Sequence, residues 1–252
     1  DGNDAMFCID KSLTLVGDLG DENVGPGENA PLIDGDGEFA TAFVLDAVSD
    51  VTINGFEITN FANPPDLFTG GIGSAIMAWD AGTSNVIVGD NYLHDLGWNG
   101  VLVGSDDGSV QSDWLVQRNI VENAAYAGIE LTNVIDSQVL NNEIMVSDGN
   151  WDVGDSGVGI EIAVRDHGTE LIAGTNVIVD GNTLSGGSGG RAAINILSRA
   201  YQSTSDALLS GVTVQNNDVF GAARGIFVTA ESRNDGSATT TDLLIKNNLI
   251  DS

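Results

Sequence analysis

The sequence predicts an all-β solenoid, in which short parallel strands stack into about seven coils and residues 1–252 form one domain. Three observations predict this fold. A short phrase with an asparagine near its centre recurs seven times, a second phrase with alternating apolar residues recurs between its copies, and no segment shows comparable helical periodicity. Because alternation is the period of a strand, each repeat is interpreted as strands joined by turns.

The first phrase predicts a column of inward-facing asparagines, called the asparagine ladder below. Its copies span residues 51–58, 86–93, 115–121, 139–144, 177–184, 212–219 and 243–250. Six copies place an asparagine two residues before an apolar one, whereas the first copy has Phe56 there. The six are Asn91, Asn119, Asn142, Asn182, Asn217 and Asn248. Stacked coils would align these amides and let them hydrogen-bond from coil to coil.

The second phrase predicts the strand on which functional side chains would stand. It begins with a small residue and continues with alternating apolar positions, at 75–78, 100–103, 128–131, 159–162, 193–196 and 225–228. The length differences between repeats belong in loops, such as the polar segment 21–31 and the glycine-rich segment 185–190. Loops of variable length leave the strands in register, so like positions stack.

The charge balance excludes several partners. Eight Lys and Arg stand against 37 Asp and Glu, which gives a formal net charge of −29. A surface so acidic argues against nucleic acid and against an anionic membrane, and no apolar run is long enough for membrane insertion. The only cysteine, Cys8, lies in an apolar stretch and is expected to be buried. The acidic composition favours an extracellular or cell-surface protein. Because the chain opens at Asp1 without a visible signal peptide, we expect a processed or excerpted piece of a larger chain.

The paired phrases carry a family resemblance. Together with segments 9–17 and 32–37, they resemble right-handed parallel β-helix proteins of the pectate-lyase-like superfamily. Segments 225–228 and 233–236 are similar to the later coils of alginate epimerase modules, a distant similarity that extends to polysaccharide lyases. The resemblance implies the fold and a polysaccharide as partner. It leaves the activity open, because the superfamily includes lyases, hydrolases, epimerases, esterases, adhesins and binding proteins.

Stacking of the second phrase predicts columns of outward side chains. One column reads Met77, Leu102, Glu130, Glu161, Asn195 and Phe227. A second aligns Arg165 with Arg199, and a third aligns His167, Tyr201 and Arg233. Five of the six arginines fall between positions 165 and 233, at Arg165, Arg191, Arg199, Arg224 and Arg233. We therefore expect a local basic patch that can hold anions despite the net charge.

This patch fits lyase or C5-epimerase chemistry on a uronate-containing polysaccharide. Such enzymes must neutralise the sugar carboxylate and move the proton at C5. Arg165 and Arg199 are the candidates for the first task, since a guanidinium binds carboxylate bidentately. His167 or Tyr201 would act as acid or base, with Glu161 completing the catalytic set. Glu130, Asn195, Arg191 and Arg233 are candidate substrate-binding residues.

Two other functions remain open at this point. Glu130 and Glu161, stacked in adjacent coils, could serve as the paired carboxylates of a glycoside hydrolase. Alternatively, the columns are surface ion pairs, His167 is a turn residue, and the protein is a non-catalytic carbohydrate-binding or adhesin module.

Aromatic and acidic residues add further candidates. Trp98 and Tyr126 precede outward columns and could bind sugar rings, or else pack against the coil wall, as Trp114 is expected to do. No cofactor is certain, but Ca²⁺ is a candidate ligand of the acidic segments 34–38, 106–107 and 148–155. Zinc is disfavoured, because the chain has only two histidines and one cysteine.

Overall fold

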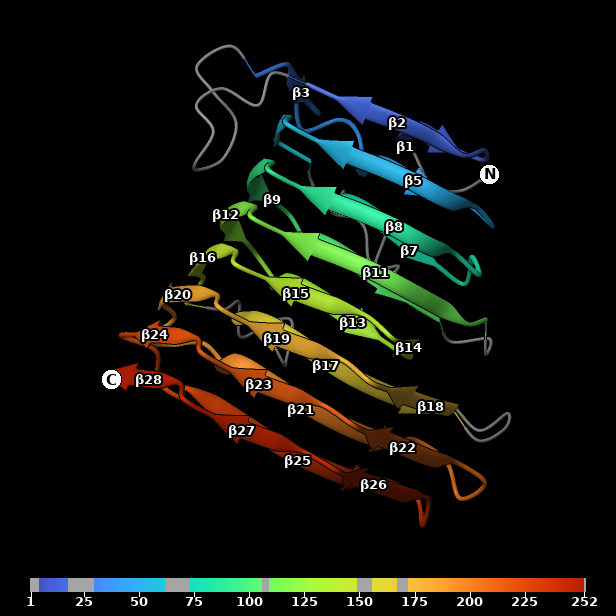
Figure 1. Cartoon of the computed structure of the whole chain (residues 1–252), viewed down its shortest axis with the longest axis vertical. Helices are drawn as coiled ribbons and strands as arrows, with labels where there is room; N and C mark the ends of the chain where they lie inside the picture. The colour runs from blue at the N-terminus through green and yellow to red at the C-terminus, as the bar shows by residue number, and fades with distance from the viewer. Residues whose placement is uncertain are drawn as a thin grey trace.

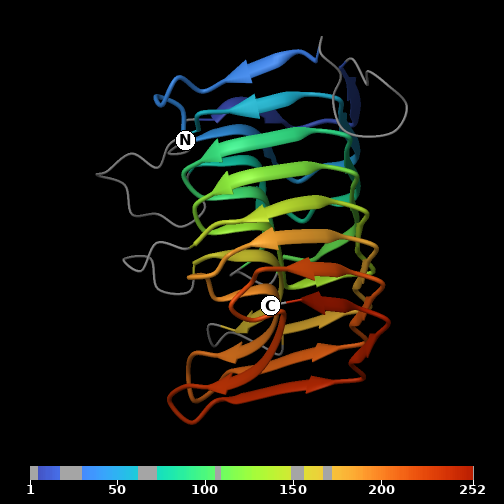
Figure 2. The ribbon, with the colours of Figure 1, turned by 90° about the vertical axis from the view of Figure 1, so that its left-hand side faces the viewer.

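The computed structural model describes residues 5–17, 30–61, 73–105, 109–148, 156–166 and 172–251. They form a right-handed parallel β-helix whose coils advance from one end to the other along a single axis (Figure 1, Figure 2). Three sheets, named A, B and C here, run the length of the stack, and the described residues contain strands, turns and bends without a helix. The predicted fold class and its coil number of about seven are confirmed.

Sheet A carries the candidate site on its outer face. Its eight parallel strands are β1 (Ala5–Ile9), β4 (Thr41–Leu45), β7 (Ser74–Trp79), β10 (Asn99–Gly104), β13 (Ala127–Thr132), β17 (Val158–Asp166), β21 (Ala192–Ala200) and β25 (Ile226–Ser232). The strands β17 and β21 are the longest of this sheet, with nine residues each. This extra length carries the second outward column, and Tyr201 of the third column directly follows β21.

Sheet B forks as the solenoid proceeds. Its first strands are β2 (Leu13–Val16), β5 (Ser49–Asn54), β8 (Ser84–Gly89) and β11 (Gln111–Gln117). Beyond β11 one track is β14 (Val134–Ile135), β18 (Ile172–Thr175), β22 (Asp206–Ser210) and β26 (Ser237–Thr241). The other track is β15 (Gln138–Leu140), β19 (Ile178–Asp180), β23 (Thr213–Gln215) and β27 (Leu244–Lys246).

Sheet C closes each coil. Its strands are β3 (Leu32–Asp34), β6 (Glu57–Thr59), β9 (Tyr92–Leu96), β12 (Ile120–Ala124), β16 (Glu143–Val146), β20 (Thr183–Gly186), β24 (Asp218–Phe220) and β28 (Leu249–Asp251). Buried apolar side chains from all three sheets fill the interior. Trp114 is 1% exposed, which confirms its predicted structural packing.

The predicted asparagine ladder lies at the turn between sheets B and C. Asn142 is representative: its Nδ2 donates to the Val116 carbonyl and to Oδ1 of Asn182, both at about 3 Å. Its own Oδ1 accepts from the backbone N–H and from Nδ2 of Asn119. Each amide thereby satisfies backbone groups of the neighbouring coils that the core would otherwise leave unpaired.

A second column, which the sequence analysis did not identify, lies at the bend within sheet B. Seven aligned residues adopt the left-handed backbone conformation with φ between 51° and 69°. Six are Asp or Asn and one is Gly: Asp50, Asn85, Asp113, Asp136, Asn176, Gly211 and Asp242. These residue types tolerate that conformation best, so the four aspartates of this column have a backbone role.

One sequence expectation about the first coil is wrong. Cys8 is exposed, whereas its apolar surroundings in the sequence led us to expect burial. The strand β1 pairs only with β4, so its outward side chains have a neighbouring strand on one side alone. No described helix could span a lipid bilayer.

Candidate functional site

The outward columns of sheet A stack as predicted. Glu130 pairs in register with Glu161, Glu161 with Asn195, and Asn195 with Phe227. The second column aligns Arg165 with Arg199. Direct strand pairing therefore brings together residues that are more than thirty positions apart in the sequence.

Glu130, Glu161, Arg165 and Tyr126 form a buried cluster, called the Arg165 cluster below. Nη1 of Arg165 donates to Oε1 of Glu130 at 2.7 Å, and Nη2 donates to the Tyr126 hydroxyl at 2.8 Å and to Glu161. Glu130 is 1% exposed and Glu161 is wholly buried. Asn99 donates to Glu130 at 2.8 Å. One cation thus bridges two carboxylates whose direct stacking would otherwise be repulsive.

Burial dominates the protonation of this cluster. It raises the pKa of Glu130 above its ordinary value, while the nearby Arg165 charge acts in the opposite direction. Burial also raises the pKa of Tyr126, with the charge of Glu161 acting in the same sense. Although burial disfavours its charge, Arg165 has a pKa well above the usual value because Glu130 and Glu161 lie beside it. Arg165 therefore stays cationic and holds the two carboxylates together.

Asn195 extends the buried polar row toward β25. Its Nδ2 donates to Oε2 of Glu161 at 2.6 Å, and its side chain is fully buried. Its Oδ1 has no hydrogen-bond partner among the described residues. Asn195 therefore orients Glu161 and leaves one acceptor unused.

Arg199, Tyr201, Glu231 and Arg233 form a second, more open group, called the Tyr201 cluster below. Nε of Arg199 donates to Oε2 of Glu231 and Nε of Arg233 donates to Oε1, both at 2.7 Å. Nη1 of Arg199 also donates to the Tyr201 hydroxyl at 3.3 Å. The side chain of Arg233 is 47% exposed. One carboxylate thus holds two guanidinium groups, and the cluster keeps a positive charge.

The Tyr201 ring lies beside both cations of its cluster. The guanidinium carbons of Arg199 and Arg233 lie 5.8 Å and 5.3 Å from the ring centroid. Although burial acts in the opposite direction, the hydrogen bond from Arg233 and the charge of Arg199 hold the pKa of Glu231 below its usual value. Sequence reasoning gave Glu231 no role, although it continues the column of Arg165 and Arg199.

The remaining arginines of the patch gather at Phe227. The guanidinium carbon of Arg224 lies 4.9 Å from the ring centroid and that of Arg191 lies 5.8 Å from it. Both arginines come from the segments just before strands β21 and β25. All five arginines of the predicted basic patch therefore serve sheet A or its entry turns.

The two aromatic candidates form one stacked pair, in which Tyr126 packs against the coil wall. Trp98 and Tyr126 stack with ring centroids 4.7 Å apart and nearly parallel planes. Tyr126 is only 6% exposed, so it supports Trp98 from beneath, and Trp98 presents the accessible part of the pair. Trp79, which the sequence analysis overlooked, stands on the same outer face and lies against Gly104 of the next coil.

Gly104→Ala should displace Trp79. A Cβ at this position would lie 2.3 Å from Cζ3 of the indole, so the ring must move. We expect a loss of about 1–3 kcal/mol in the free energy of unfolding. Urea denaturation followed by circular dichroism would measure it. In a Trp79→Leu background the same substitution should cost much less, and an equal cost in both backgrounds would contradict the contact.

Several predicted residues are not among those described. His167 lies outside the described residues, as do positions 106–107, 152 and 155 of the candidate calcium segments. Asp34 is described, and its Oδ1 accepts from the Asp36 N–H and from Nδ2 of Asn60. Across the described ranges, no group of three His, Cys, Asp or Glu side chains is arranged to hold a metal.

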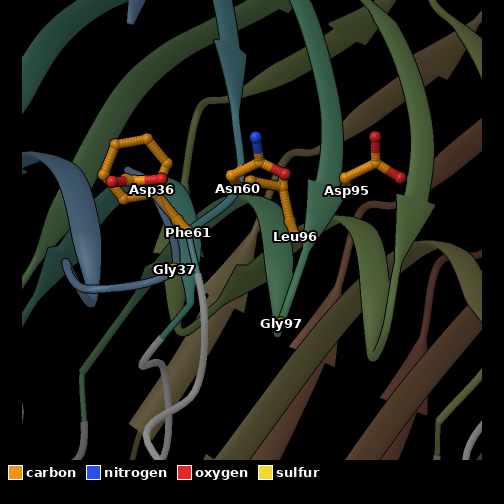
Figure 3. A pocket seen from close by; sticks show the side chains of 7 residues that line it. All are labelled: Asp36, Gly37, Asn60, Phe61, Asp95, Leu96 and Gly97. Carbon is orange, nitrogen blue, oxygen red and sulfur yellow. The ribbon is translucent and has the colours of Figure 1, made fainter. Parts of the chain in front are cut away.

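A separate pocket lies at the corner between sheets C and A, with a volume of about 640 Å³. It is lined by Asp36, Gly37, Asn60, Phe61, Asp95, Leu96 and Gly97 (Figure 3). Two carboxylates and no basic side chain line it, so an anionic sugar would be repelled there. The arginine patch on sheet A is the better anion site.

Comparison with known proteins identifies the fold. No family model matches the sequence, and no curated protein matches it significantly. Among solved structures, an alginate lyase from Paenibacillus sp. strain FPU-7 is similar, with a TM-score of 0.53 and 14% identity over 92% of this chain and 77% of the lyase. At this identity the similarity shows the parallel β-helix fold alone.

Two further structures are less similar. A lacto-N-biosidase from Eubacterium ramulus has a TM-score of 0.37 and 11% identity over 99% of this chain and 56% of that enzyme. The A-module of mannuronan C-5 epimerase AlgE4 from Azotobacter vinelandii has a TM-score of 0.25 and 14% identity over 96% of this chain and 78% of the module.

Proposed function

We propose that the outer face of sheet A binds an acidic, uronate-containing polysaccharide and acts on it as a lyase or C5-epimerase, outside the cell. One observation carries the proposal: on a chain with net charge −29, five of the six arginines lie on sheet A or next to its strands, with Arg199 and Arg233 beside the Tyr201 ring. A polyanion would otherwise be repelled by this protein. The alginate lyase named above shares the fold and is consistent with such a substrate.

Within the patch, the Tyr201 cluster is better suited to the reaction than the Arg165 cluster. Arg165 already contacts two carboxylates and is largely buried. In contrast, Arg233 uses Nε for Glu231 and its side chain is 47% exposed, so its terminal nitrogens can reach a ligand. Arg199 is buried and holds Glu231 and the Tyr201 hydroxyl in place. A sugar carboxylate bound by Arg233 would have Tyr201 beside it. This revises the role expected of Arg165 from carboxylate binding to support of the site.

The chemistry follows from these positions. Neutralising the carboxylate makes the C5 proton more acidic, and the Tyr201 oxygen, once deprotonated, removes that proton. In elimination, a C4–C5 double bond forms, the C4–O bond breaks and the leaving oxygen takes the proton that Tyr201 removed from C5. In epimerisation, a water molecule on the opposite face returns a proton to C5. Both outcomes share the first step, so the residues described here support both.

Tyr201→Phe should lower turnover at least about a hundredfold, because it removes the proton-transfer group and leaves the ring in place. Ultraviolet absorbance of the unsaturated product on alginate and polygalacturonate would report elimination, and NMR of the polymer would report epimerisation, each with and without Ca²⁺. Tyr92→Phe is the matched control, because Tyr92 lies on sheet C, where its hydroxyl donates to Glu122. Full activity of the Tyr201 variant would reject this site.

Binding without catalysis is the second candidate, and one observation favours it. Glu231 already neutralises part of the charge that Arg199 and Arg233 would present to a substrate. Wild-type protein that binds these polymers but forms no product would establish the binding function. Wild-type protein that neither binds nor converts any acidic polysaccharide would refute both.

A glycoside hydrolase using Glu130 and Glu161 receives no comparable support. Both carboxylates are buried and are held by Arg165. A hydrolase would need at least one of them to reach the glycosidic oxygen.

A further inference from the structure

Trp98 and Tyr126 form one aromatic pair at the entry to sheet A. Their backbones occupy the same position in adjacent coils, since the Tyr126 N–H donates to the Trp98 carbonyl at 2.9 Å. The coil before Trp98 has Gly73 at this position, and the coil after Tyr126 has Gly157. Neither glycine has a side chain that could continue the stack. One face of the Trp98 ring therefore stacks on Tyr126, and the equivalent position beyond its other face carries no side chain.

The glycine at position 73 is required by the backbone. Its φ of 95° lies in the left-handed region that favours glycine. A Cβ there would also lie 2.9 Å from the backbone of Gly97 and 3.0 Å from the Trp98 nitrogen. Trp98 is itself partly exposed. The chain thus keeps a large aromatic ring that is supported on one face and has no side chain at the neighbouring position.

The Tyr126 ring is held in place by the Arg165 cluster. Its hydroxyl accepts from Nη2 of Arg165 at 2.8 Å, and the ring is buried. Arg165 in turn is fixed by Glu130 and Glu161, so a buried network sets the orientation of Tyr126. Because the Tyr126 ring is fixed, the parallel ring of Trp98 loses little freedom when a ligand binds. The proton transfer described above does not use this rigid surface.

A pyranose ring is the ligand that this surface fits. One face of a pyranose carries mainly C–H groups, which pack against an aromatic ring while the hydroxyls remain in water. We propose that Trp98 is a stacking platform for a sugar of the same polysaccharide and that Tyr126 is its positioning residue. The inference rests on the proposed function and deepens it, because the polymer is bound at a second place on sheet A by a contact that needs no charge.

The two contacts with the polymer lie far apart on the sheet. In the coil of Tyr201, the position equivalent to Trp98 is Arg191, because the column continues from Gly157 to Arg191. The ten residue steps from Arg191 to Tyr201 span about 33 Å along an extended strand. A single sugar cannot reach both contacts. We therefore expect a long oligosaccharide to bind more tightly than a monomer.

Removal of the Trp98 ring tests the platform. Calorimetric titration would compare oligogalacturonates and their methyl esters on wild-type protein and on Trp98→Ala. We expect the variant to bind both ligands about tenfold more weakly, because stacking does not depend on the charge that esterification removes. In contrast, the loss caused by Arg233→Gln should be larger for the charged oligomers than for their esters. Phe220→Ala is the matched control, because this exposed ring lies on sheet C, and it should bind both ligands as wild type does.

Fluorine NMR of protein labelled with fluorotryptophan tests the platform with every ring in place. Each of the four tryptophans gives its own resonance, and single-site variants assign them. Oligogalacturonate should shift the Trp98 resonance and leave that of the buried Trp114 unchanged. Tyr126→Phe keeps the stacked ring but loses the hydroxyl that Arg165 holds. In this variant the Trp98 resonance should change before ligand is added, and the oligomer should bind about threefold more weakly.

The outcomes separate this inference from the proposed function. Oligomers that bind wild type and Trp98→Ala alike, with the Trp98 resonance unshifted, would overturn the platform and leave the proposed function standing. An unchanged Trp98 resonance in Tyr126→Phe would overturn the positioning role of Tyr126. Failure of every uronate oligomer to bind the wild type would instead overturn the proposed function, and this inference with it.

Discussion

Replacing Arg165 with methionine should lower the free energy of unfolding by about 3–5 kcal/mol at neutral pH, because it removes one partner of a buried ion cluster. The substitution leaves Glu130 and Glu161 buried, stacked in register and without their cation. Methionine preserves much of the length and apolar volume of the arginine stem, so the loss reports the charge rather than a cavity. Urea denaturation followed by circular dichroism would measure it.

The loss of stability in Arg165→Met should depend on pH in a defined direction. Without Arg165, burial and the charge of Glu161 would raise the pKa of Glu130 further in the folded state. A carboxyl with a raised folded-state pKa contributes stability below its unfolded-state pKa and loses it as the pH rises through the folded-state value. The free energy of unfolding of Arg165→Met should therefore be closest to that of wild type in acid and furthest below it at neutral pH.

The matched control is the triple variant with Glu130→Gln and Glu161→Gln added to Arg165→Met. It removes the stranded charges and should recover much of the stability at neutral pH. If Arg165→Met were as stable as wild type at neutral pH, or its deficit were independent of pH, the cluster would not be buried as described.

The repeat made much of the architecture predictable. Once the asparagines are aligned, strand pairing follows, because adjacent coils of a parallel solenoid pair like positions. The same alignment placed Glu130 beside Glu161 and Arg165 beside Arg199, and the register confirms both pairings. The strand period within each repeat and the stacking of the repeats predict the same structure. The short repeated phrases are therefore sufficient to predict the fold.

The side-chain geometry could not be predicted in the same way. Arg165 reaches back to Glu161 on its own strand and to Glu130 on the previous one. A column alignment gives the position of a backbone, whereas the direction of a long flexible side chain depends on burial and on competing partners. Glu231 shows the same limit: its column was visible, but its bridge between Arg199 and Arg233 was not.

The amino-acid composition also did not reveal that some aspartates have a backbone role. The acidic segments suggest ligands for a cation such as Ca²⁺, yet aspartates such as Asp50 and Asp113 occupy left-handed backbone positions at the bend within sheet B. Asparagine serves the same purpose at Asn85 in that column. Because the side chains of this column share a backbone conformation rather than a chemical role, their acidity says little about ligands.

Asn142→Ala should lower the free energy of unfolding by about 2–5 kcal/mol, because buried groups lose their partners at no gain elsewhere. The backbone N–H of Asn119 and the carbonyl of Val116 would each lose a hydrogen bond from the Asn142 amide. Neither can be reached by water in the interior, since Asn119 is fully buried and Val116 likewise.

The ladder supplies its own control in Asn248→Ala. Asn248 makes the same bonds, to Asn217 and to the Val214 carbonyl, but its side chain is only partly buried. Water can replace part of what is lost there, so the cost should be clearly smaller than at Asn142. Hydrogen exchange would locate the damage, with the Asn119 amide exchanging faster in Asn142→Ala. Equal losses of unfolding free energy at both positions would contradict this explanation. They would mean that the asparagine ladder stabilises the fold through side-chain packing, because packing does not depend on access of water.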